Sequence, residues 1–90
     1  MAHLRSQPEL VARVRRIAGQ LSSVERGLTD GAECAAVLQQ VAAIRGAVNG
    51  LMDEVLEAHL REHVAAPELT PAERAQGAQD VLAAIRRYAK

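Results

Sequence analysis

Two kinds of side chain that bind transition metals occur at restricted positions of this chain. The only cysteine is Cys34, and the histidines are His3, His59 and His63. His59 and His63 are four residues apart, so on a helix they project from one face. Two imidazoles and a thiolate form a donor set for a borderline transition metal. The alternative interpretations are that Cys34 is a small buried hydrophobe and that the histidine pair arises by chance.

The cysteine and the histidine pair lie at opposite ends of one long apolar stretch, residues 32–64. No proline interrupts it, and apolar residues recur at helical spacing: Val37, Val41, Ile44, Val48, Leu51 and Val55. The spacing predicts one helix over about 32–64, roughly 48 Å long, which is too long for a 90-residue chain to bury alone. Cys34 would lie in its first turn, where the helix dipole favours the thiolate that binds metals or attacks electrophiles.

One straight helix cannot bring these groups together, because Cys34 and His59 lie roughly 37 Å apart along its axis. Two copies packed antiparallel can, because the start of one helix then meets the end of the other. We expect the helices to cross near position 47 or 48, where small residues cluster: Ala42, Ala43, Gly46, Ala47 and Gly50. The sequence therefore predicts a homodimer with a composite Cys/His/His cluster at each end, with His3 near the cluster.

Two further amphipathic segments flank the long one. Residues 7–28 carry an apolar stripe, Leu10, Val14, Ile17, Leu21, Val24 and Leu28, after a capping box from Ser6 to Glu9. A turn ending at Gly31 then returns the chain. A second capping box, Thr70 to Glu73, opens a helix over about 71–89. We predict an all-α fold of three helices in one domain, residues 1–90.

The formal net charge is zero, with 11 basic and 11 acidic side chains, but the charges are segregated. Arg13, Arg15 and Arg16 form a basic group in the first helix, either a DNA-binding surface or a solvated face. No helix-turn-helix pattern is present. Tyr88 is the only aromatic residue, which disfavours base stacking as a mode of binding.

We expect a cytoplasmic chain, since neither a signal peptide nor a membrane span is recognisable and one cysteine permits no internal disulfide. Enzyme chemistry is disfavoured. A Cys–His pair assembled across a dimer would have no oxyanion hole or substrate pocket. Glu54 and Glu57 lack the Glu-x-x-His partners of a di-iron bundle.

Two runs of residues resemble a known family. Residues 33–52, Glu-Cys-Ala-Ala-Val-Leu-Gln-Gln-Val-Ala-Ala-Ile-Arg-Gly-Ala-Val-Asn-Gly-Leu-Met, and residues 13–20, Arg-Val-Arg-Arg-Ile-Ala-Gly-Gln, are similar to the CsoR/RcnR/FrmR family of bacterial repressors. The resemblance covers essentially the whole chain. It implies a disc-shaped tetramer, a dimer of antiparallel dimers, that binds operator DNA without a helix-turn-helix and releases it when an effector binds.

Within that family the chain most resembles the RcnR nickel/cobalt sensors. Their pattern of Met-x-His followed by Cys, His and His matches His3, Cys34, His59 and His63, and the Ala2 amine could also coordinate once Met1 is removed. Copper(I) sensors have cysteine where this chain has His63. Formaldehyde sensors have proline where this chain has Ala2.

The resemblance implies Ni(II) or Co(II) as effector, and the donor set also accommodates Zn(II). Glu33 and Glu62, beside the ligands, would be hydrogen-bond partners that orient them. The expected function is repression of a metal-efflux gene by the metal-free protein. The alternative within the same family is a formaldehyde-responsive repressor that uses Cys34.

Overall fold

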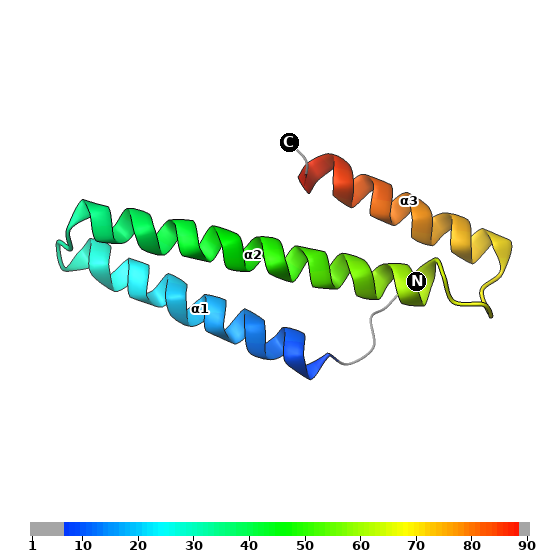
Figure 1. The fold of residues 1–90 in the computed structure, drawn as a ribbon, viewed down its shortest axis with the longest axis horizontal. Coiled ribbons are helices and arrows are strands. Elements are labelled where there is room, and N and C mark those ends of the chain that lie inside the picture. The colour runs from blue at the N-terminus through cyan, green and yellow to red at the C-terminus, as the bar shows by residue number, and fades with distance from the viewer. Residues whose placement is uncertain (1–6, 89–90) are drawn as a thin grey trace. The chain divides into compact units, whose positions relative to one another are not determined.

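A computed structural model of the chain describes residues 7–88 and contains three helices and no strand over that range. They are α1 (Pro8–Thr29), α2 (Cys34–His63) and α3 (Pro71–Tyr88), drawn in Figure 1. The predicted all-α class with three helices is confirmed. None of these helices, over the described residues, has the length and apolar character that a membrane span requires. The chain divides into two compact units, Gln7–Asp53 and residues 54–88.

In the first unit, α1 and the opening part of α2 form a helical hairpin (Figure 1). The N-cap of α1 is Gln7, whose side chain makes no capping bond, with proline in the first turn. The expected capping box begins at Ser6, which lies outside the described residues.

The turn between α1 and α2 is built around Gly31, whose φ of 73° is unfavourable for residues with a side chain. The Ala32 N–H donates to the Gly27 carbonyl at 2.8 Å, and the Asp30 N–H donates to the Arg26 carbonyl at 2.9 Å. The bond from Ala32 to Gly27 is typical of a Schellman motif, in which a glycine follows the last turn of a helix. This tight turn reverses the direction of the chain, so α2 runs back along α1.

The helical hairpin buries few apolar side chains. Only three hydrophobic side chains among residues 7–88 are buried, and two of them, Ile17 and Ile44, lie on α1 and α2. One side-chain bond links the helices near the turn, from Gln40 Nε2 to Ser23 Oγ at 3.0 Å. The single chain therefore leaves most of both apolar stripes exposed.

The exposed part of the α2 stripe contains Leu38, Val41 and Val48, at 64%, 50% and 43% exposure. Val11, Val14 and Leu21 are likewise exposed on α1. So many large apolar side chains exposed on a small chain favour contact with another protein surface.

The small residues of α2 are used differently from our expectation. Ala47 faces α1, and a Cβ at Gly50 would come within 2.6 Å of Arg13 Nη1. Nothing lies within 4 Å of a Cβ built at Gly46. Part of the cluster that we assigned to a partner helix therefore packs inside the chain, because an arginine of α1 fills the space over Gly50.

The second unit pairs the last turns of α2 with α3. The predicted capping box is present: the Thr70 N–H donates to Glu73 Oε1 at 2.8 Å, and the Glu73 N–H donates to Thr70 Oγ1 at 3.1 Å. The hydrogen bond from the Thr70 N–H, and then a hydrogen bond from the Thr70 side chain, favour the charged carboxylate and lower the pKa of Glu73 from its usual 4.5. Gly77 and Val81 are the buried residues of α3.

Candidate functional site

The histidine pair lies on the last two turns of α2. The ring centroids of His59 and His63 are 4.9 Å apart and the ring planes are inclined by 53°. Both residues are half-buried. The i, i+4 spacing in a regular helix produces this arrangement, which lets two imidazoles face one ion.

One nitrogen of the pair is held by α3. His59 Nε2 lies 3.0 Å from the Gly77 carbonyl oxygen. A carbonyl can only accept, so Nε2 carries the proton and donates. In the neutral ring the lone pair is then on Nδ1, which is the atom left to coordinate a metal. A ring nitrogen bonded to a backbone carbonyl is the usual support of a metal-binding histidine.

His63 is held by close backbone packing. A Cβ built at Gly77 would collide with the His63 carbonyl and would lie 3.1 Å from the His63 Cβ. Only glycine lets α3 approach α2 this closely. Glu62 Oε2 lies 3.9 Å from His63 Nε2, so the carboxylate is a neighbour of the ring at a distance beyond a hydrogen bond.

Arg74 of α3 fixes the turn that follows His63. Its guanidinium donates to the carbonyls of Val64, Ala66 (3.1 Å) and Leu69 (3.4 Å). Carbonyls at the end of a helix have no partner within it. The planar fork of arginine can reach several of them together, so one side chain holds the whole segment between α2 and α3.

Cys34 is the first residue of α2 and His63 is its last. Cys34 is a free, exposed thiol. The neighbouring Glu33 is exposed, and its carbonyl accepts the N–H groups of Ala36 (3.1 Å) and Val37 (3.2 Å). His3 and Ala2 lie outside the described residues. Within residues 7–88 of one chain, no group of three His, Cys, Asp or Glu residues could hold an ion.

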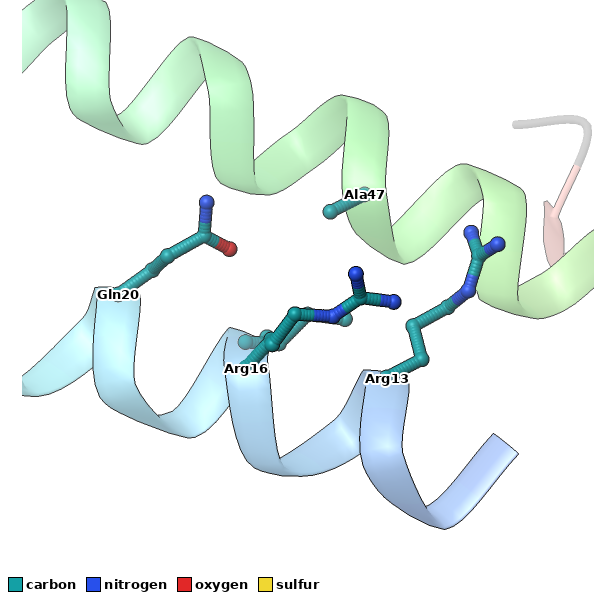
Figure 2. A pocket seen from close by; sticks show the side chains of 5 residues that line it. Arg13, Arg16, Gln20 and Ala47 are labelled. Carbon is teal, nitrogen blue, oxygen red and sulfur yellow. The ribbon is translucent and has the colours of Figure 1, made fainter. Parts of the chain in front are cut away.

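The arginines of α1 have different surroundings. Arg13 is half-buried against Gly50, and Arg16 and Arg15 are exposed. Figure 2 shows the Arg13 and Arg16 side chains extending toward α2. Together with Ile17, Gln20 and Ala47 they line a pocket of about 300 Å³. The pocket is thus lined by two guanidinium groups, one amide and two apolar side chains.

Sequence reasoning missed Arg74 and Gly77. Gly77 interrupts an otherwise helix-favouring segment, where glycine costs about 1 kcal/mol relative to alanine. Taken alone, the glycine indicates only a less stable helix. Its position four residues beyond the Thr70–Glu73 box was the available signal that α3 packs closely there. The role of Arg74 had no signal in the sequence, because it depends on the fold of the connecting segment.

Comparison with known proteins gives consistent matches. Residues 6–87 match the model of the metal-sensitive transcriptional repressor family. An uncharacterized protein in the bioA 5′ region of Serratia marcescens is 55% identical over the full length of both chains. A transcriptional repressor RcnR homolog of Escherichia coli is 54% identical over 71% of this chain and 72% of its own.

A solved structure is also similar, that of a histidine-substituted variant of the formaldehyde-responsive regulator FrmR from Salmonella enterica serovar Typhimurium. It is 46% identical, with a TM-score of 0.85 over 90% of this chain and 91% of that chain.

Proposed function

Because this chain belongs to the metal-sensitive transcriptional repressor family, the CsoR/RcnR/FrmR family, we propose that it represses by binding operator DNA without metal and is released by Ni(II) or Co(II). The gene it controls would be a metal-efflux gene. A repressor acts where the chromosome is, so we assign it to the cytoplasm.

The observation that carries the choice of effector is the His59–His63 pair, with ring centroids 4.9 Å apart at the end of α2. Imidazoles together with one thiolate suit Ni(II) and Co(II), and a single thiolate is a poor basis for selecting Cu(I). The same donors bind Zn(II), so coordination number and geometry would have to discriminate. The RcnR homolog among the relatives supports the same assignment.

We propose that the full ligand set is His59 and His63 of one protomer, the partner's Cys34, and His3, with the Ala2 amine as a further donor. Glu33 and Glu62 would orient the ligands. When bound, the metal would supply a link between α2, the N-terminal segment and the second protomer.

The exposed apolar surfaces support a dimer of dimers. Twenty-five residues correspond to nearly seven helical turns, so Cys34 and His59 share the face of α2 that carries Leu38, Val41 and Val48. Covering that face with a second α2 in antiparallel orientation would bury it and complete two sites. The exposed strip on α1, Val11, Val14 and Leu21, is then available for contact between dimers.

DNA binding is assigned to Arg13, Arg15 and Arg16 on α1. Guanidinium groups bind phosphates and contribute affinity that depends on salt. A symmetric tetramer would repeat the group four times, so several turns of DNA backbone could be contacted. Binding of the effector would lower operator affinity by a coupling free energy of about 1–3 kcal/mol.

Formaldehyde is the alternative effector. The likeness to the formaldehyde-responsive regulator and the exposure of the Cys34 thiol favour it. A thiol adds to an aldehyde carbon without any metal, so this effector would need Cys34 and not the histidines.

The test is operator binding by the metal-free protein, challenged separately with Ni(II), Co(II), Zn(II), Cu(I) and formaldehyde. We expect release by Ni(II) and Co(II) at concentrations at which Cu(I) and formaldehyde have no effect. Release by formaldehyde alone would replace the metal assignment with the alternative.

A further inference from the structure

Two residues of α3, Arg74 and Gly77, contact α2 at its histidines and at the segment directly after them. We propose that both are positioning residues for the histidine pair, which hold it in one tautomer and one orientation before any ligand arrives. The inference deepens the proposed function and rests on it, since it assigns a role toward the proposed metal site.

Gly77 acts through its carbonyl oxygen. That oxygen lies inside α3, where one lone pair accepts the helical N–H four residues later, and His59 Nε2 at 3.0 Å uses the other. The opposite tautomer of His59 would direct a lone pair at this oxygen and would be repelled. The contact therefore keeps the lone pair on Nδ1, away from α3.

Gly77 also acts through its missing Cβ. The His63 carbonyl occupies the space that a side chain would need, and the carbonyl carbon would lie 2.7 Å from the added atom. The obstruction is backbone, so it cannot move aside as a flexible side chain can. A larger residue at 77 must shift α3, which lengthens the His59 bond at the same time.

Arg74 acts on the segment that follows His63 in the chain. The Val64 and Ala65 N–H groups both bond to the Leu60 carbonyl, at 3.1 and 2.8 Å, and Arg74 then binds the carbonyls that follow. With this side chain in place the last turn of α2 cannot fray readily. His63 therefore keeps the orientation that places its ring 4.9 Å from His59.

The first test uses the wild-type protein without metal. Two-bond proton–nitrogen correlation spectra, at a pH at which imidazoles are neutral, identify the protonated nitrogen of each ring. We expect His59 to carry its proton on Nε2. A proton on Nδ1 would overturn the role of Gly77, whether or not the protein proves to be a metal sensor.

The second test compares Gly77→Ala and Arg74→Gln with two controls, Gly19→Ala and Arg86→Gln. Nothing lies within 4 Å of a Cβ at Gly19, and Arg86 is exposed on α3. In Co(II) titrations we expect the test variants to lose about 10–100-fold in affinity and to show altered ligand-field bands, while the controls match wild type. Circular dichroism checks that helix content is retained.

The outcomes separate the two proposals. Unchanged affinity and bands in both folded test variants would refute the positioning role while leaving the proposed function intact. Failure of the wild-type protein to bind Ni(II) or Co(II) would refute the proposed function, and the His59 tautomer would still decide whether Gly77 sets the ring. If Gly77→Ala does not fold, Arg74→Gln and the wild-type spectrum remain decisive.

Discussion

The Arg13 guanidinium lies directly over Gly50, so close that a Cβ on Gly50 would come within 2.6 Å of Nη1. The absence of a side chain at position 50 therefore lets an arginine of α1 lie across α2. The same arginine lines the pocket that Arg16, Gln20 and Ala47 share (Figure 2). An assigned DNA-binding residue is thus held in place by the packing of the helical hairpin.

Gly50→Ala should displace Arg13 at little cost to folding. The obstructing atom is the end of a flexible side chain, and alanine gains up to about 1 kcal/mol of helix propensity over glycine. We expect the free energy of unfolding in urea to stay within about 1 kcal/mol of wild type and operator affinity to change. Gly19→Ala, with open space around its Cβ, is the control that should leave operator affinity unchanged. A large loss of stability in Gly50→Ala would show that the Arg13–Gly50 contact is rigid.

Arg13→Ala and Arg16→Ala should each weaken operator binding and reduce its dependence on salt. Each lost phosphate contact lowers the slope of log affinity against log salt by about 0.9. Fluorescence anisotropy over a range of salt concentrations measures both effects. Arg26→Ala, at the other end of α1, removes the same charge and should have a smaller effect. If Arg13→Ala and Arg16→Ala both bind the operator as tightly as wild type, these two residues are not the DNA contacts.

The Glu73 carboxylate should stabilise α3 only above acidic pH. Its pKa is lowered in the folded chain by the bonds to Thr70, so the stabilisation is complete above the unfolded pKa, near 4.5, and is lost as pH falls through the lower folded pKa. Glu73→Gln should therefore be less stable than wild type at neutral pH, and the difference should shrink in acid. Urea unfolding of both proteins from pH 7 to pH 3 measures the difference in their free energy of unfolding. A difference that grows in acid would contradict the role of the Glu73 carboxylate.

The proposed composite site predicts complementation between defective protomers. Cys34→Ala and His59→Ala/His63→Ala proteins should each lack the full site, but a mixed dimer contains one complete set. Co(II) titration of the mixture should restore thiolate charge-transfer absorption in the near-ultraviolet. Mixtures that show no gain over either variant would mean that the antiparallel dimer does not build the site.

Local signals explain what could be predicted from the sequence. Helical structure could be predicted because its signals lie between residues that are close in the chain. These signals are the apolar periodicity of residues 32–64 and the Thr70–Glu73 capping box. The first and last residues of α2 are Cys34 and His63, which places both candidate ligand groups at helix ends as expected.

Contacts between helices could not be predicted. Periodicity places Val14 and Leu21 on the apolar stripe of α1 but does not say which helix covers them, and in the single chain both are exposed. The positions of Gly50 beneath Arg13 and of Gly77 against His63 depend on how closely two helices approach, which no spacing pattern records.

The most direct test of the account is Ni(II)-driven release of operator DNA, measured for wild type and for His59→Ala/His63→Ala by fluorescence anisotropy. Both metal-free proteins should bind the operator with similar affinity, because the histidines lie on α2 and the assigned DNA contacts lie on α1. Ni(II) should release the wild type and leave the double variant bound. Equal release of the two proteins by Ni(II), or release of wild type by formaldehyde but not by Ni(II), would contradict a metal-sensing histidine pair.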